Sequence, residues 1–223
     1  GRTGALPYVG IGWYRTNFEL SASDLDQKFQ LLFDGAMSNA KVYVNGNYVG
    51  ERPFGYISFY FNITKFLTSG SNTIAVRLEN FSSQSRWYPG AGLYRKVSVI
   101  KTNKTHVKSW GTFVTTPVIN EKQAQVHLEL EVLGDGNCLV VNQIISPEGK
   151  LVAKSSKEII LNENQKITED FKVEKPMLWD LKTPNIYELK TTIFKNGKVV
   201  NSYTTPFGIR SIRFELDGFY LNN

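Results

Sequence analysis

The sequence predicts an all-β protein made of two consecutive β-sandwiches. Strand signals recur about every ten residues, and no window of about 11 residues shows the 3.6-residue apolar period of an α-helix. Aromatic residues make up 13% of the chain, and their enrichment in tyrosine and phenylalanine favours strands. With 41% hydrophobic and 21% charged residues, the composition is that of an ordinary globular protein.

The first sandwich is expected to occupy residues 1–103. Its clearest element is a hairpin at 41–50, where Asn45-Gly46 supplies two residues that tolerate positive φ in a type I′ turn. In 55–64, alternate residues from Ile57 to Ile63 are apolar, which places them on one packed face of a strand. The other strands are expected at 13–20, 27–33, 73–79 and 94–101.

The second sandwich is expected to occupy residues 104–207. Seven predicted strands in about 100 residues are typical of an immunoglobulin-like sandwich. Glycine-containing turns at 134–136, 147–149 and 196–197 separate several of them. The seven strands are predicted at 107–115, 124–133, 138–145, 151–160, 165–173, 186–194 and 198–205.

The last segment, 207–223, stops a few residues after a predicted Asp217-Gly218 turn, inside an apparent hairpin, so we expect the chain to be cut from a longer protein. The first residue is a glycine, so we expect the natural start and any export signal to lie upstream. The sequence leaves a bacterial cytoplasmic and a periplasmic location equally open.

Composition excludes several classes of function. The net charge of +6 comes from lysines and arginines spread along the chain, which indicates a solvated surface and no nucleic-acid partner. The single Cys138 excludes an internal disulfide and a thiolate zinc site, and His106 and His127 are too few for a histidine metal cluster. We therefore expect no metal and no cofactor. No apolar run of about 18 residues predicts a membrane span.

No catalytic residue is predicted. Serine-hydrolase, nucleotide-binding and zinc-protease motifs do not occur in the sequence. The acidic residues lie in predicted loops, beside turns or on the polar sides of strands, where structural roles are the default. They are Asp24, Asp26, Glu129, Glu131, Glu163 and Glu169.

The loop at 80–95 has a composition suited to sugar contact. Sugar recognition combines an aromatic plane, which covers the apolar face of a pyranose, with groups that hydrogen-bond its hydroxyls. The candidate substrate-binding residues are Asn80, Ser85, Arg86, Trp87 and Tyr88. A structural reading is equally open on residue types alone, in which Trp87 and Tyr88 plug the end of the sandwich or an interdomain seam.

Five motifs, in this order, resemble family 2 glycoside hydrolases of β-galactosidase type. They are Gly12-Trp13-Tyr14-Arg15, Phe33-Asp34-Gly35-Ala36, Val42-Tyr43-Val44-Asn45-Gly46, the run from Arg86 to Arg95, and Phe207-Gly208-Ile209-Arg210. The order and spacing make the resemblance more specific than any single motif, and it covers the whole chain.

The resemblance implies a domain order. The first domain would be a jelly-roll, galactose-binding-like sandwich at 1–103, the second an immunoglobulin-like sandwich at 104–207, and 208–223 the start of a (β/α)₈ barrel. Both catalytic glutamates would then lie beyond Asn223. The family's matching loop approaches the barrel mouth, which makes Arg86 and Trp87 the best site candidates. Ser85 stands where some members carry an acidic residue that contacts sugar and cation, so a bound sodium is not expected.

These expectations define one function and two rivals. The chain would be the non-catalytic N-terminal part of a retaining hydrolase that cleaves terminal β-galactosides or related O-glycosides in carbohydrate metabolism. Its partners would be its own C-terminal barrel and the carbohydrate, and alone it would be inactive. One rival is a stand-alone carbohydrate-binding or adhesion module. The other is a scaffold whose exposed face at 55–64 makes subunit contacts in a homo-oligomer.

Overall fold

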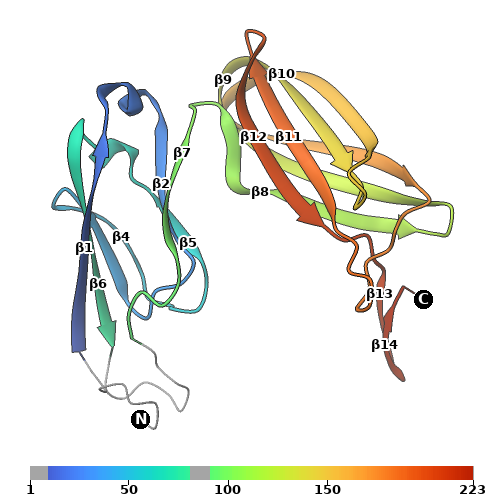
Figure 1. The fold of residues 1–223 in the computed structure, drawn as a ribbon, viewed down its shortest axis with the longest axis horizontal. Coiled ribbons are helices and arrows are strands. Elements are labelled where there is room, and N and C mark those ends of the chain that lie inside the picture. The colour runs from blue at the N-terminus through green and yellow to red at the C-terminus, as the bar shows by residue number, and fades with distance from the viewer. Residues whose placement is uncertain (1–9, 81–90, 223) are drawn as a thin grey trace. The chain divides into compact units, whose positions relative to one another are not determined.

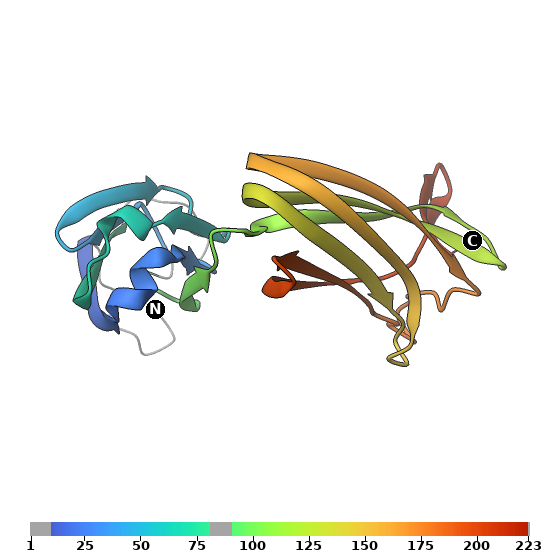
Figure 2. The ribbon, with the colours of Figure 1, turned by 90° about the horizontal axis from the view of Figure 1, so that it is seen from above.

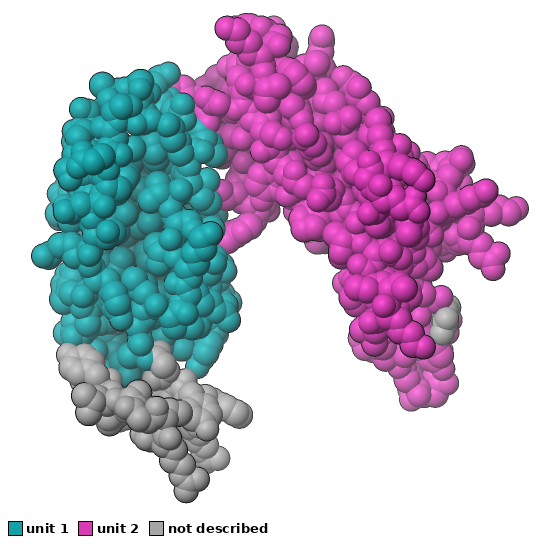
Figure 3. All heavy atoms as spheres, in the orientation of Figure 1, with its two compact units in different colours: residues 1–102 teal, residues 103–223 magenta. Residues whose placement is uncertain are grey.

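A computed structural model describes residues 10–80 and 91–222 (Figure 1). The chain divides into two compact units, Gly1–Thr102 and Asn103–Asn223 (Figure 3). Each unit consists of antiparallel strands, and the described helices are two short 3₁₀ turns, η1 (Ala22–Asp26) and η2 (Thr64–Phe66). The predicted all-β fold class is therefore confirmed. Neither described helix is long enough to cross a membrane.

Unit 1 is a sandwich of two sheets. The four-stranded sheet has the order β1 (Gly10–Leu20), β6 (Gly70–Asn80), β3 (Ala40–Val44), β4 (Asn47–Arg52). The three-stranded sheet has the order β5 (Phe59–Asn62), β2 (Lys28–Phe33), β7 (Val97–Thr102). Strands distant in sequence pair in both sheets, because β1 pairs with β6 and β2 pairs with β7.

The core of unit 1 follows the two-residue period of its strands. Phe29, Leu31 and Phe33 on β2 are buried, as are Val42 and Val44 on β3. Full burial of such a side chain contributes about 1.5–3 kcal/mol before entropy is considered. The alternate residues of the four-stranded sheet form its outer face.

The predicted hairpin is present between β3 and β4. Asn45 and Gly46 have φ values of 50° and 79°, as a type I′ turn requires. The Asn45 Nδ2 donates to Asn72 Oδ1 at 2.8 Å and to the Phe66 carbonyl at 2.9 Å. The Asn45 side chain therefore ties the turn to the neighbouring loop.

The strand predicted over 55–64 is shorter than expected. Only Phe59–Asn62 pairs with β2, and Ile57 is 41% exposed, so its predicted place on the packed face is wrong. The preceding backbone is engaged elsewhere: the Gly55 carbonyl accepts a hydrogen bond from Tyr94 Oη at 2.8 Å. That contact turns the chain away from the ladder.

Unit 2 is the immunoglobulin-like sandwich that the sequence predicts. Its sheet has the order β10 (Leu151–Glu174), β9 (Gln123–Ile145), β11 (Tyr187–Lys195), β12 (Lys198–Phe207), and β8 (His106–Ile119) also pairs with β9. The predicted alternation on β9 is confirmed, since the side chains of Val126, Leu128, Leu130 and Val132 are fully buried. A hairpin of β13 (Ile212–Glu215) and β14 (Gly218–Leu221) follows.

The four strands predicted between 124 and 173 are two long strands. β9 and β10 stay in register through the expected turn at 134–136, where Asp135 pairs with Asn162 (Figure 2). Gly134, Gly136 and Glu163 take φ values of 140°, 74° and 63°, which bend the ribbon without breaking it. The first half of β9 pairs with β8 and the second half with β11, so one strand serves both sides of the sandwich.

Replacement of Gly134 by alanine should destabilise unit 2 by about 2 kcal/mol, because strain and overlap act together. Its φ of 140° disfavours any side chain, and an added Cβ would lie 2.9 Å from Thr105 Cα. Gly136→Ala is the matched control, since its φ is 74° but no atom lies within 4 Å of an added Cβ. Urea unfolding should show the larger loss for Gly134→Ala; equal losses would mean that the contact with Thr105 is unimportant.

The Phe207-Gly208-Ile209-Arg210 motif closes unit 2 around Trp179. The Ile209 side chain is fully buried, and its carbonyl accepts a hydrogen bond from the Trp179 amide at 2.9 Å. A Cβ on Gly208 would lie 2.9 Å from Trp179 Cγ, and the Arg210 guanidinium lies 4.8 Å from the centre of the indole. Each of these three residues has a distinct role in holding the indole.

Candidate functional site

The predicted sugar-contact loop begins and ends on fixed backbone. β6 ends at Asn80, and the chain is again held at Gly92, which forms a bridge with Met37 through hydrogen bonds of 3.1 and 2.9 Å. Ser85, Arg86, Trp87 and Tyr88 lie in 81–90, outside the described residues, so their roles stay predictions.

Asn80 is the candidate contact residue that the structure describes. Its side chain is 6% exposed and faces inward, in phase with the buried residues of β6. Within the described residues its Oδ1 has no hydrogen-bond partner. A buried carbonyl oxygen left in this state costs about 1–3 kcal/mol. Asn80 therefore offers a hydrogen-bond acceptor where the loop begins, but its side chain is almost inaccessible to a ligand.

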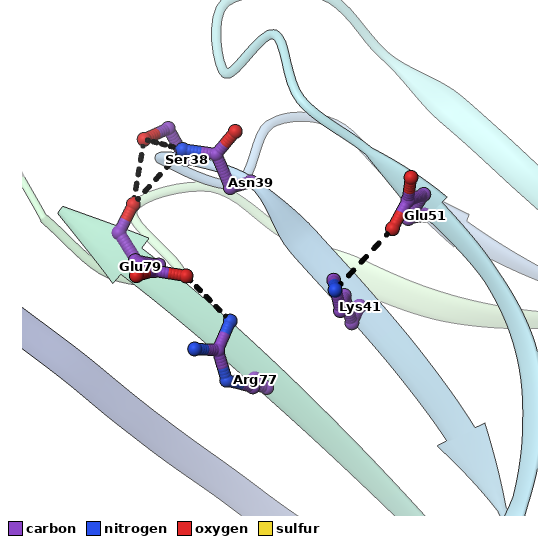
Figure 4. Close-up of polar contacts among 6 residues, drawn as sticks. All are labelled: Ser38, Asn39, Lys41, Glu51, Arg77 and Glu79. Atoms are coloured by element: carbon purple, nitrogen blue, oxygen red, sulfur yellow. Dashed lines mark hydrogen bonds and ion pairs between the residues drawn. The ribbon is translucent and has the colours of Figure 1, made fainter. Parts of the chain in front are cut away.

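A small hydrogen-bonded clamp holds the outgoing end of the loop (Figure 4). The Glu79 amide donates to the Ser38 carbonyl at 2.9 Å, and Ser38 Oγ donates back to the Glu79 carbonyl at 2.9 Å. Asn39 Nδ2 adds a donor 3.3 Å from the same carbonyl. Sequence reasoning missed this clamp, because Ser38 and Asn39 lie in an irregular connection without a periodic signal.

The returning end is held by an aromatic side chain and a cation. Tyr94 Oη donates to the Gly55 carbonyl at 2.8 Å, and the Arg95 guanidinium lies 5.2 Å from the centre of the Tyr94 ring. A Cβ on Gly35 would lie 2.7 Å from Tyr94 Oη, which explains the glycine at this place. Two of the resembling motifs, Phe33 to Ala36 and Arg86 to Arg95, thus meet at this point.

The charges beside the clamp are paired. Arg77 Nη1 lies 2.7 Å from Glu79 Oε2, and Lys41 Nζ lies 3.6 Å from Glu51 Oε2 (Figure 4). Partly exposed pairs of this kind contribute at most about 1 kcal/mol each. Their main effect is to leave little unbalanced charge at this place.

The general acid of a glycosidase needs a raised pKa, and five described carboxyl groups show the opposite shift. Where the pKa of a described carboxyl departs clearly from its ordinary value, it is lowered. A hydrogen bond from Lys101 leads the causes that hold the pKa of Asp24 at about 2, and a hydrogen bond from Lys108 lowers the pKa of Glu131. The pKa is also lowered for Glu148, Asp170 and Asp180.

Metal binding has no support in the described residues, where no three histidine, cysteine, aspartate or glutamate side chains gather closely enough to hold an ion. Over 10–80 and 91–222, the structure supplies a scaffold that holds both ends of the loop.

Two family models match nearly the whole chain. The model for the sugar binding domain of glycosyl hydrolases family 2 matches residues 5–103, and the model for glycosyl hydrolases family 2 matches residues 105–210. The first match coincides with the unit 1 sandwich and the second with the immunoglobulin-like sandwich.

Similar proteins of known family support these two matches. The chain is 40% identical to β-galactosidase BoGH2A of Bacteroides ovatus, with 98% of this chain and 27% of that protein covered. It is 31% identical to a β-glucuronidase of Formosa agariphila, with 96% of this chain and 25% of that protein covered.

Solved structures share the fold. A glycosyl hydrolase family 2 member from Bacteroides cellulosilyticus superposes with a TM-score of 0.92 at 32% identity, over 98% of this chain and 31% of that one. A β-glycosidase from Bacteroides vulgatus gives a TM-score of 0.89 at 32% identity, over 96% of this chain and 28% of that one.

The fold, together with a loop whose two ends are held by hydrogen bonds, defines a pair of accessory β-sandwich domains. The chain belongs to glycosyl hydrolase family 2 and carries its N-terminal sugar-binding domain and its immunoglobulin-like domain, both non-catalytic. It spans less than a third of the length of each relative and structure named above.

Proposed function

We propose that the chain is the N-terminal part of a retaining β-galactosidase-like glycoside hydrolase, and that its domains support the catalytic barrel and shape the substrate pocket. The observation that carries the proposal is the 40% identity to a β-galactosidase over 98% of this chain, across both domains. The parent would hydrolyse a terminal β-galactoside or a related O-glycoside with two carboxyl groups about 5–5.5 Å apart.

The clamp supports a role for the loop in substrate binding. Ser38 and Asn39 fix the outgoing end at Glu79, and Met37 fixes the returning end at Gly92. A binding loop performs best when a rigid scaffold sets where it starts and ends. In the full enzyme, Trp87 would cover one face of the terminal sugar, and Arg86 would hydrogen-bond its hydroxyls.

The exposed hairpin supports a catalytic domain that follows unit 2. Phe214 is 80% exposed, Phe219 is 56% exposed, and Leu216 at the turn is fully exposed. Apolar side chains concentrated in this way usually mark a contact surface. We therefore place the start of the barrel at 208–223 and expect the barrel to cover the hairpin.

The first test compares this chain with the same gene product extended through its C-terminal region, on chromogenic β-glycosides that include a galactoside and a glucuronide. The extended protein should hydrolyse one of them and thereby name the substrate class, while the chain alone should hydrolyse none. Activity in neither protein, with sugar bound by the chain, would favour the stand-alone binding module.

The second test concerns the loop. In the extended protein, Trp87→Ala and Arg86→Gln should each lower kcat/KM at least tenfold, a loss of about 1.4 kcal/mol of transition-state stabilisation. Phe113→Ala is the control, because Phe113 is an exposed aromatic residue on β8 of unit 2. Unchanged kcat/KM in both loop variants would assign Trp87 and Arg86 a structural role only.

A further inference from the structure

The outer face of the four-stranded sheet in unit 1 carries a second group of side chains suited to sugar recognition. Trp13 and Arg15 on β1 lie on the same face as Ala75 on β6 and Tyr43 on β3, because the register pairs Arg15 with Ala75 and Ala75 with Tyr43. Residues two apart on a strand share a face, so this face is opposite to the core.

A hollow of about 550 Å³ lies on this face, lined by Trp13, Arg15, Tyr43, Asn45, Thr73 and Ala75, with Gly46 at its rim. Its shape follows from side-chain length. Ala75 is short and stands between Arg15 and Tyr43, whose backbones are two strand spacings, about 10 Å, apart.

The aromatic side of the hollow is formed by Trp13 and Tyr43, and Tyr48 extends this aromatic cluster beyond the hollow. The Trp13 and Tyr43 ring centres are 5.7 Å apart, and those of Tyr43 and Tyr48 are 5.6 Å apart. Trp13 is 55% exposed and Tyr48 is 50% exposed. Tryptophan and tyrosine cover apolar surface at a small entropic penalty and keep a polar edge in water, which suits a pyranose ring.

The cationic side of the hollow is Arg15. No acidic group within the described residues forms an ion pair with its guanidinium, whereas Lys41 and Arg77 on the same face are paired with Glu51 and Glu79. A guanidinium that forms no ion pair with these residues can bind a planar anion, and a carboxylate matches its two parallel N–H donors.

The rim of the hollow is held in place. Asn45 Oδ1 accepts the Thr73 amide at 2.8 Å, which fixes the turn against β6. Thr73 Oγ1 donates to Asn17 Oδ1 at 2.8 Å, so its oxygen stays free to accept a hydrogen bond from a sugar hydroxyl. The aromatic rings, the Arg15 guanidinium and the Thr73 oxygen therefore all lie on strands of the sheet, beside a turn that is held by hydrogen bonds.

We propose that this hollow binds an acidic saccharide, with a uronate ring stacked on Trp13 and Tyr43 and its carboxylate on Arg15. The inference goes beyond hydrolysis by the parent enzyme, because it concerns binding by residues of unit 1 that are not part of the 81–90 segment. It would let the protein hold an acidic polysaccharide or oligosaccharide through the sheet face.

Titration of this 223-residue chain with a β-linked glucuronic-acid oligosaccharide and with its neutral glucose counterpart, by calorimetry and NMR, tests the proposal. The acidic ligand should bind in the millimolar range or tighter. Trp13→Ala should weaken binding of both ligands at least tenfold, and Arg15→Gln should weaken binding of the acidic ligand alone. Phe113→Ala and Lys157→Gln, at exposed positions of unit 2, are the controls.

Several outcomes would overturn the inference. One is acidic-ligand binding unchanged in Trp13→Ala while circular dichroism shows the variant folded; another is no preference for the acidic ligand. A dimer in light scattering that Trp13→Ala dissociates would show that a second copy covers this face. Hydrolysis by the extended protein is a separate readout, so failure of either proposal is distinguishable from failure of the other.

Discussion

Replacement of Ile209 by alanine is expected to lower the free energy of unfolding of unit 2 by about 2–5 kcal/mol, the usual range for a fully buried isoleucine. The Ile209 side chain is fully buried in the unit 2 core, and its carbonyl receives the Trp179 amide at 2.9 Å. A cavity at this place would remove contacts from the core and loosen the backbone that the indole packs against. Urea unfolding followed by circular dichroism measures the change.

Ile212→Ala is the matched control. Ile212 is three residues further along the chain on β13 and is 49% exposed, so its loss should change stability by less than about 0.5 kcal/mol. Equal effects of the two substitutions would contradict the view that the motif at 207–210 closes the sandwich. They would point to the hairpin as a stabilising element in its own right.

Asn72→Ala is the second large expected effect, about 3 kcal/mol of unit 1 stability. The Asn72 side chain is fully buried and satisfies four groups. Its Nδ2 donates to the Thr68 and Gly70 carbonyls at 2.7 and 3.0 Å, and its Oδ1 accepts the Thr68 amide at 2.9 Å and Asn45 Nδ2 at 2.8 Å. Truncation leaves these partners buried and unpaired, at about 1–3 kcal/mol for each one that water cannot reach.

Thermal unfolding of Asn72→Ala and of Asn162→Ala should be compared. The difference between the two variants separates the loss of the Asn72 hydrogen bonds from the general effect of replacing an asparagine side chain. Asn162 is exposed on β10, and its side chain has no hydrogen-bond partner among the described residues, so its replacement should be nearly neutral. A neutral Asn72→Ala would mean that water enters the loop and takes over its hydrogen bonds.

Sequence periodicity predicted the fold class and most strands, because alternation and turn chemistry are local signals. Asn45-Gly46 and Asn196-Gly197 both form turns with positive φ at each residue. The division of 124–173 into four strands was wrong. Glycines at 134 and 136 are compatible both with a ladder that ends there and with a ladder that continues through a bend. Which of the two occurs depends on the partner strand, which is not a local property.

The candidate site was predictable only in part. The composition of the 80–95 loop indicated sugar contact, and its fixed ends are consistent with a positioned loop. The clamp at Ser38 depends on pairing between segments about 40 residues apart, which no local pattern encodes. Trp13 and Arg15 were noted as part of a motif, but their grouping with Tyr43 required the strand order β1-β6-β3.

The bent ribbon of β9 and β10 also bears on how unit 2 folds. Its ladder begins at the pair Ile145 and Leu151, beside a tight turn, and ends at the pair Gln123 and Glu174. Because each pair forms next to the one before it, each step closes only a slightly longer loop. Strands β8 and β12 likewise pair with sequence neighbours, whereas the β9–β11 ladder joins Ile145 to Glu188 across all of β10. Among the ladders of unit 2, closure of this one has the greatest loop entropy, and we expect it to limit the folding rate of the immunoglobulin-like unit.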